Sequence, residues 1–435
     1  MKVPAFTLFA AASAFLAMAT ATQAQPATPL LLNDAITKAM ETSHRLAEAR
    51  AHQEGAEAAV QVRHVADRPT LGVSGGYSRT NHVDPFVVPQ PIGLPRVIYP
   101  DIPDNYFTRM SFQWPIYTAG RFDALERAAA AEARASAEDV ATARADLRLE
   151  VVRVYWALAT AGEAVRVLEE AVARAEAHLR DVRARFDAGF IPPNDVSSVE
   201  VQRSREELQL IEARNIRQSL VEDLKRLTGV TGDIAIAERL DASTTIADAA
   251  QAPAAQRSEQ RAIAERLSAT DDRIRAIEAG RRPTISVTGT GDYANPNPRI
   301  FPRAGTWRTS WELGVVASWN LWDGGRVDAD VAEAVANQKA IRERQADLDL
   351  QIVTEVRQRQ LDLDSARASL TTATDGARSA AEARRVVSER FNVGVATTTE
   401  VLDAQVALLQ AELDRTRALA SIRLAEARLD RALGR

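Results

Sequence analysis

Apolar residues recur along two long stretches of the chain in alternating steps of four and three. One stretch covers residues 147–186 and the other covers residues 352–391, where Arg359 and Arg384 interrupt the pattern. A seven-residue repeat with two apolar positions is typical of helices that pack lengthwise as coiled coils. We therefore expect two long helices, each with an apolar seam along one side.

The first long helix is expected from about Arg121 to about Asp187, where the chain has no proline and only one glycine. At about 1.5 Å per residue such a helix is roughly 100 Å long, which exceeds the width of a globular core. Two helical segments of about half this length, near 33–66 and 195–228, flank it. We expect them to stack end to end beside the long helix. A turn with Gly189 and two prolines reverses the chain at one end.

A period of two appears in other segments. Residues 70–78 and 109–116 alternate between apolar and polar or small side chains, and the odd-numbered residues from Trp307 to Leu321 form a face that is apolar except for Thr309. An apolar outer face, a polar inner face and aromatic residues near the ends are typical of a membrane β-barrel. Alternation alone equally suits a soluble sheet with one buried face.

The number of strands separates these two interpretations. One chain supplies four such strands, whereas a closed barrel needs about eight or more, and open sheet edges are not tolerated in lipid. Several chains must therefore share one barrel if the sheet lies in a membrane. Three chains would give twelve strands above a ring of twelve helical rods.

The chain is internally duplicated. Three motifs return at a fixed offset of 205 residues, which indicates a duplicated unit: 114–121 returns as 319–326, 185–189 as 390–394, and 224–229 as 429–434. We expect a signal peptide at 1–24, a first structural repeat at 25–229, a linker or equatorial segment at 230–255, and a second structural repeat at 256–435.

Composition narrows the function. Lys2, an apolar stretch and a small-residue run that ends at Ala24 predict a secretory signal peptide. The chain has no cysteine, and its net charge of -5 argues against a nucleic-acid partner. Its five histidines show no ligand spacing, and it has neither a nucleophile motif nor a phosphate loop. We therefore expect no enzymatic activity, no cofactor and no metal site.

Residues 81–105 contain six prolines and join two of the expected strands. Proline removes a backbone donor, so regular structure is not expected there. This long loop should lie at the end of the strands away from the helices.

In their order, duplication and spacing, these motifs resemble those of the TolC family of outer-membrane efflux proteins over essentially the whole mature length. The matching features are the strand-to-helix corners at Gly120 and at Gly324 and Gly325, the helical tips 185–196 and 390–401, and the end of each copy. The resemblance implies an α+β membrane protein, a TolC-like homotrimeric channel-tunnel. Each protomer would give four β-strands to a shared 12-stranded barrel, followed by a long coiled-coil α-helical barrel.

The function implied by this resemblance is that of an outer-membrane exit duct in a tripartite efflux or type I secretion system. Such a passive conduit lies in outer-membrane lipid, extends into the periplasm, and docks to a periplasmic adaptor (membrane fusion) protein and an inner-membrane pump of the RND, ABC or MFS class. The alternative is a structural periplasmic coiled-coil stalk or adhesin without a channel. Strand alternation with outward tryptophans favours the channel, because a stalk has no need of it.

The resemblance also assigns roles to residues. Glu400 and Asp403 are spaced i, i+3 on one helix face and fall on the acidic pore constriction of the family, although a solvated helix face is the alternative. Asp195 matches an aspartate that an arginine holds in the closed state of the family, but Ala396 stands where that arginine would be. A closed resting state would therefore need another contact. The tip residues expected to dock the adaptor are Arg185, Phe186, Gly189, Asp195, Arg390, Phe391 and Gly394.

Overall fold

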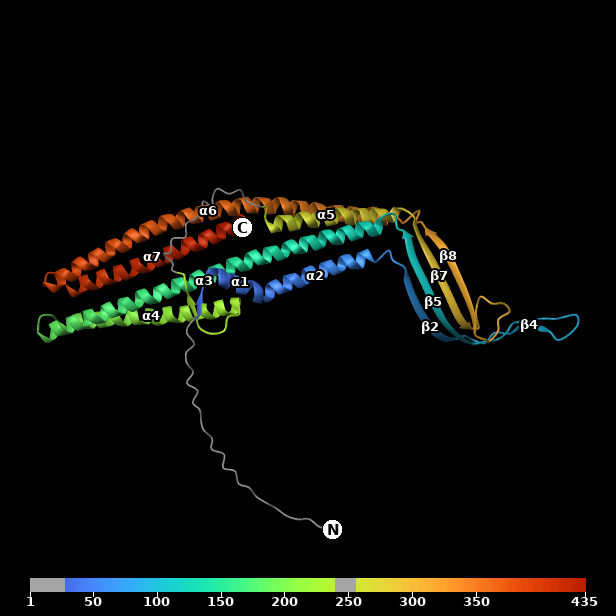
Figure 1. The fold of residues 1–435 in the computed structure, drawn as a ribbon, viewed down its shortest axis with the longest axis horizontal. Helices are drawn as coiled ribbons and strands as arrows, with labels where there is room; N and C mark the ends of the chain where they lie inside the picture. Colours follow the sequence, from blue (N-terminus) through green and yellow to red (C-terminus); the bar gives the residue numbers. More distant parts are fainter. Residues whose placement is uncertain (1–27, 239–255) are drawn as a thin grey trace, which may run out of the picture.

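The protein is an elongated bundle of helices with a β-sheet at one end (Figure 1). The computed structural model describes residues 28–238 and 256–435, so the expected signal peptide and much of the expected linker lie outside the described residues. In chain order the elements are β1 (Thr28–Leu30), α1 (Leu32–Thr42), α2 (His44–His64), β2 (Thr70–Arg79), β3 (Phe86–Val88), β4 (Arg96–Tyr99), β5 (Asp104–Tyr117), α3 (Arg121–Asp187), α4 (Pro193–Thr228), β6 (Ile234–Ile236), α5 (Ser258–Glu278), the 3-10 helix η2 (Ala279–Arg281), β7 (Thr284–Asn295), β8 (Arg308–Ser318), α6 (Arg326–Asn392) and α7 (Thr398–Ala432).

Two helices of 67 residues each, α3 and α6, run nearly the whole length of the bundle. The shorter helices lie along one half or the other: α2 and α5 near the sheet, α4 and α7 at the opposite end (Figure 1). The predicted long helix and the end-to-end stacking of shorter helices are confirmed. Several apolar seam positions of α3, among them Val151, Ala175 and Val182, are fully buried, as expected from the heptad pattern.

The first short segment differs from the prediction, because it consists of two helices that break at Ser43. The backbone of Ser43 is extended, and its hydroxyl accepts a hydrogen bond from the N–H of Leu46 at 3.3 Å, so that it caps α2. The other piece, α1, packs against α3 and α4 and buries Ala35 and Ala39 completely. The prediction of one continuous helix over 33–66 was therefore wrong.

A junction near the middle of the bundle holds several helix and strand ends together, and the ion pair of Arg431 with Asp146 at 2.8 Å there joins the two halves of the chain. Strand β1 pairs in parallel with β6, and the buried hydroxyl of Tyr155 donates to the Leu30 carbonyl at 3.0 Å. Nearby, Arg257 and Arg431 both bind the carboxylate of Glu259. Burial by itself would raise the pKa of Glu259, but these hydrogen bonds outweigh it and lower the pKa to about 2. The carboxylate therefore stays ionised and links α5 to α7.

Four antiparallel strands form the sheet in the order β2, β5, β7, β8. The strand register gathers apolar side chains on one face, and the predicted alternation is confirmed. Trp311, Leu313 and Val315 of β8 are 80%, 65% and 68% exposed. The other face is polar, and on it Arg109 Nε donates to Asp292 Oδ1 at 2.7 Å. The sheet thus has an exposed apolar face and two edge strands, β2 and β8. Such a surface is normally covered by an apolar environment or by another chain.

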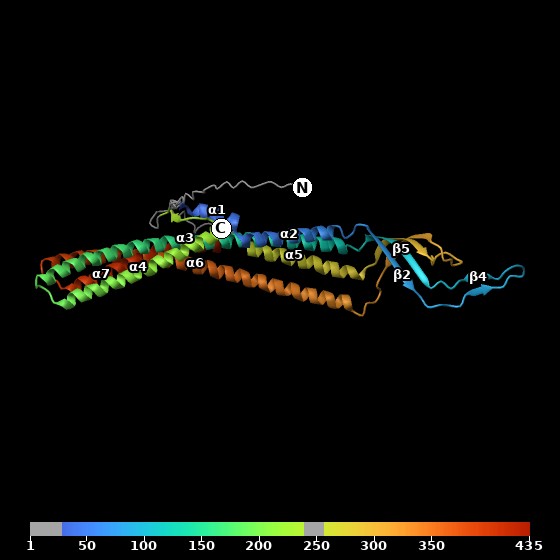
Figure 2. The same cartoon turned by 90° about the horizontal axis from the view of Figure 1, so that it is seen from below.

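The proline-rich loop extends beyond the sheet, away from the helices, as predicted (Figures 1 and 2). Its expected lack of regular structure was wrong, since β3 and β4 pair as a small antiparallel hairpin. The prolines at positions 85, 89, 95 and 100 stand just outside these strands, so they remove no hydrogen bond from the ladder. The guanidinium of Arg303 lies 5.1 Å above the Tyr99 ring and holds the hairpin against the β7–β8 loop.

Candidate functional site

Two helical hairpins end side by side at the pole opposite the sheet (Figure 1). We call this pole the tip; it comprises the α3–α4 turn at 188–192 and the α6–α7 turn at 393–397. Gly189 and Gly394 have φ angles of 78° and 81°, which a residue with a side chain adopts only under strain. In both turns the chain returns hydrogen bonds to the last helical turn, from Phe190 N to Arg185 O and from Val395 N to Arg390 O.

A hydrogen bond joins the starts of α4 and α7. Thr398 Oγ1 donates to Asp195 Oδ2 at 3.0 Å, and Thr398 is only 4% exposed. Asp195 therefore does have a partner from the second hairpin, although Ala396 cannot supply one. This threonine could not be identified from the sequence, because three consecutive threonines at 397–399 do not indicate which one faces α4.

The second contact between the hairpins is centred on Phe391. The guanidinium of Arg185 lies 4.2 Å above its ring and donates from Nη1 to the Phe391 carbonyl at 3.0 Å. On another side, the ring of His178 meets it edge-on at 5.2 Å. Phe391 is 5% exposed and belongs to an apolar cluster with Val182 and Val401. In this conformation Phe391 is a packing residue, and it offers almost no surface to a docking partner.

Other tip residues are accessible. Phe186, the counterpart of Phe391 in the first repeat, is 41% exposed. Phe190, Val393 and Val395 lie in or beside the turns and are 81%, 75% and 65% exposed. Sequence reasoning missed these three residues, although large apolar side chains in a turn between helices are themselves a signal for a binding surface.

The two acidic residues of the expected constriction lie in the first turns of α7, and both are exposed. Glu400 also caps its own helix: its carboxylate accepts from the Thr397 N–H at 2.6 Å, while Thr397 Oγ1 accepts from the Glu400 N–H at 3.3 Å. The hydrogen bonds from Thr397 lower the pKa of Glu400. Glu400 therefore combines a structural role with its negative charge. Asp403, one turn further along, makes no such capping bond.

Two titratable groups are buried between the helices above the tip. Burial lowers the pKa of His178, and the neighbouring Arg185 lowers it further, against the opposing effect of Asp181. Burial raises the pKa of Glu206 on α4, although a hydrogen bond from Gln202 opposes this rise. Neutral His178 thus suits the apolar contact with Phe391, and its protonation would disfavour that contact.

The strand-to-helix corners match in geometry as well as in sequence. Gly120 and Gly325 precede α3 and α6 with φ angles of 79° and 87°. Gly324 has a φ of 71°, and its counterpart Ala119 adopts a φ of 54° despite its side chain. In the second corner Asp323 accepts hydrogen bonds from two backbone N–H groups that open α6, which lowers its pKa.

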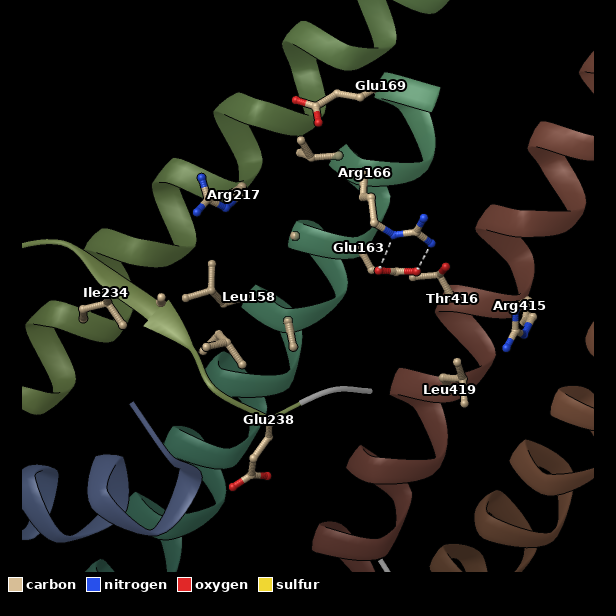
Figure 3. Close-up of a pocket in the computed structure, with 15 residues that line it drawn as sticks. Leu158, Glu163, Arg166, Glu169, Arg217, Ile234, Glu238, Arg415, Thr416 and Leu419 are labelled. Carbon is tan, nitrogen blue, oxygen red and sulfur yellow. Dashed lines mark hydrogen bonds and ion pairs between the residues drawn. The ribbon is translucent and has the colours of Figure 1, made fainter. Parts of the chain in front are cut away.

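A hollow of about 680 Å³ lies between α3, α4, α7 and β6. Figure 3 shows the side chains that line it. Its central cation, Arg166, donates from Nε to Glu163 Oε2 at 3.0 Å and also pairs with Glu170. The charge of Arg166 is therefore balanced by these two carboxylates.

The described residues include no cluster of three or more His, Asp or Glu side chains that could hold a metal ion. None of the helices in residues 28–238 and 256–435 combines the length and apolar character that a bilayer crossing requires.

Comparison with known proteins identifies the family to which this architecture belongs. Residues 35–230 and 249–435 match the model of the outer membrane efflux protein family. Outer membrane protein TolC of Escherichia coli (strain K12) is 24% identical over 319 residues, which cover 70% of this chain and 64% of TolC. The matched part thus spans a little under two thirds of the length of that relative.

Solved structures share the fold at low sequence identity. The CmeC outer membrane channel of Campylobacter jejuni superposes with a TM-score of 0.74 at 18% identity, covering 93% of this chain and 85% of CmeC. The outer membrane protein VceC of Vibrio cholerae gives a TM-score of 0.77 at 18% identity, with coverage of 93% and 96%. The fold is therefore that of the TolC-like channel-tunnels, and the protein is located in the outer membrane and extends into the periplasm. The chain belongs to the outer membrane efflux protein family.

Proposed function

We propose that three copies of this chain assemble into a passive conduit across the outer membrane, built from the two structural repeats at 25–229 and 256–435. The observation that carries the proposal is the four-stranded sheet with an exposed apolar face and two open edges. Backbone groups at a sheet edge cannot remain unpaired in lipid. Three copies of four strands close a barrel of twelve, with the apolar faces toward lipid and the Arg109–Asp292 face toward the lumen.

At the other pole, the tip is suited to docking a periplasmic adaptor (membrane fusion) protein that links the conduit to an inner-membrane pump of the RND, ABC or MFS class. The exposed apolar residues in the turns support this role, since they form an apolar surface that a partner protein could cover, at the end of the molecule opposite the sheet. Glu400 and Asp403 would ring the threefold axis at the entrance and favour cations there. The substrate would pass without chemistry.

The tip also contains a candidate for the contact that keeps the resting conduit closed. Asp195–Thr398 and Arg185–Phe391 each join one hairpin of a protomer to the other. Widening the tip by moving the hairpins apart would break both contacts. These two contacts would therefore replace the contact that an arginine at position 396 would make, since that position is an alanine in this chain.

Electrical recording tests the proposal. Purified mature protein reconstituted into a planar lipid bilayer is expected to give discrete single-channel currents, because the proposed barrel encloses the polar face of the sheet. A periplasmic stalk or adhesin would give none, and it would remain in the soluble fraction when cells are fractionated. Outer-membrane protein without any conductance, even after destabilisation of the tip, would contradict a conduit.

A further inference from the structure

A second hollow lies on the other face of α3 from the one beside β6, and we call it the trough. It has a volume of about 560 Å³, and its lining comes from α3, α4 and α7 of a single copy. The α3 residues that line the two hollows form two separate sets, and at about 100° per residue these sets centre on opposite sides of the helix. The trough is therefore a separate space from the hollow at Arg166.

Small side chains on α3 form the floor of the trough. They are Ala157, Thr160, Ala161 and Ala164, which follow the i, i+3, i+4, i+7 spacing of one helix face. Short side chains at four such positions leave a depression along α3. This run of small residues accounts for the space between α4 and α7.

The walls of the trough are apolar. Ile216 and Leu220 line it from α4, and Leu413 and Leu424 line it from α7. Ile216 is 57% exposed, so the trough is open to solvent along this wall. Covering such a surface with a hydrocarbon chain removes apolar area from water, which is favourable.

The charges along the trough have one sign. Among the described residues, the charged side chains that line it are Arg153 of α3 and Arg417 of α7, and no carboxylate lines it. Arg417 pairs with Asp414 of its own helix at 3.2 Å and remains 68% exposed. Arg153 is exposed and makes no hydrogen bond or ion pair with residues 28–238 or 256–435. The trough therefore attracts an anionic group and repels a cationic one.

We propose that the trough binds a single-chain anionic amphiphile of the class of medium-chain fatty acids. The carboxylate pairs with Arg153, whose guanidinium can donate two parallel hydrogen bonds to it, and the hydrocarbon chain lies along the floor. The rise along α3 from Arg153 to Ala164 is about 16 Å, which accommodates an extended chain of medium length. This inference goes beyond the proposed conduit and does not depend on it, because one copy supplies every lining residue.

Binding of decanoate to the mature protein in lipid nanodiscs tests the proposal. Isothermal titration calorimetry below the micelle concentration of decanoate is expected to show saturable binding, after correction for partition into empty nanodiscs. Decanol and decyltrimethylammonium have the same chain length, and we expect weaker binding of the alcohol and none of the cation. Equal heats for all three probes, or decanoate binding that does not saturate, would overturn the proposal.

Two pairs of variants separate the trough from the rest of the surface. Arg153→Gln should raise the Kd of decanoate about tenfold, because it removes the charged donor. The control Arg148→Gln removes another exposed arginine of α3, which lines a different hollow, and should leave the Kd unchanged. An equal effect of both variants would show that decanoate responds to overall charge and would overturn the proposal.

The second pair concerns the hydrocarbon chain. Ile216→Ser should weaken the binding of decanoate several-fold, whereas Ile211→Ser should not. Both isoleucines are exposed on α4, 57% and 63%, and only Ile216 lines the trough, so neither variant is expected to disturb folding. Equal loss of binding in the two variants would contradict a chain that lies in the trough.

Photolabelling locates the bound chain directly. Decanoate with a diazirine at the end of its chain is expected to label peptides that contain residues 153–164 of α3 or 413–424 of α7. Labelling confined to the sheet would place the amphiphile in the lipid around the barrel and overturn the proposal. Neither outcome bears on the proposed conduit, which single-channel recording tests independently.

Discussion

Thr398→Val removes the hydroxyl that joins the two hairpins at the tip and preserves the shape of the side chain. Thr398 is buried and Asp195 is half-buried, so the hydrogen bond to this carboxylate falls at the lower end of the range for charged groups, about 1.5 kcal/mol. Three such bonds in a trimer amount to about 4.5 kcal/mol, a shift of about a thousandfold in the ratio of open to closed tips. Valine cannot replace the donor.

The assay is the fraction of time that a single reconstituted channel spends in its high-conductance state. We expect this fraction to rise strongly in Thr398→Val and to stay near the wild-type value in Thr398→Ser, which keeps the hydroxyl. Cells that carry the valine variant should also become sensitive to a large hydrophilic antibiotic. The reasoning is refuted if valine and wild type show the same open fraction, or if serine is as leaky as valine.

Four further predictions concern other parts of the molecule. Because burial lowers the pKa of His178, the unfolded state takes up a proton first as the pH falls below about 6.5, and the tip should become less stable. Protease cleavage of the tip should therefore accelerate on acidification, and His178→Leu should make the cleavage rate less dependent on pH. Glu259, with a pKa of about 2 against an ordinary 4.5, should contribute about 3 kcal/mol to the free energy of unfolding, which is lost as the pH falls through this window; Glu259→Gln should lower the thermal unfolding temperature at neutral pH and change little at the acid limit. Glu400→Gln with Asp403→Asn should reduce cation selectivity and leave assembly intact, since glutamine can still accept the capping hydrogen bond; unchanged reversal potentials in a salt gradient would place the constriction elsewhere. An epitope inserted at Gly93, in the hairpin loop beyond the sheet, should bind antibody on intact cells, and labelling only after lysis would reverse the topology.

Long-range periodicity explains which parts of the fold could be predicted from sequence. The boundaries of α3 follow from the apolar repeat over residues 147–186 and from the lack of proline across all 67 residues of the helix, with Gly120 at one end and Gly189 beyond the other. Short elements have no comparable pattern. The break at Ser43 arises because α1 packs across two other helices, and that contact is not visible in the local sequence. The six prolines in residues 81–105 led to the wrong prediction that this loop has no regular structure. Strands β3 and β4 can pair because the prolines lie outside them, and the sequence alone does not show where the strands begin and end.

The duplicated motifs show a different limit. Arg185–Phe186 and Arg390–Phe391 are the same dipeptide in sequence, yet Phe186 is exposed and Phe391 is buried. The order of helices in the bundle makes the difference, since Phe391 packs between the two hairpins of the protomer and Phe186 does not. The capping box formed by Thr397 and Glu400, by contrast, can be predicted from its Thr-x-x-Glu spacing.

Native mass spectrometry of the mature protein, extracted from outer membranes in a mild detergent, tests the central claim most directly. The claim is that three copies, each with four strands, close one barrel. We predict a single species with three times the mass of the mature chain, which dissociates to monomers only on denaturation. A monomer, or a stable assembly of two or four copies, would contradict the twelve-stranded barrel and the conduit built on it.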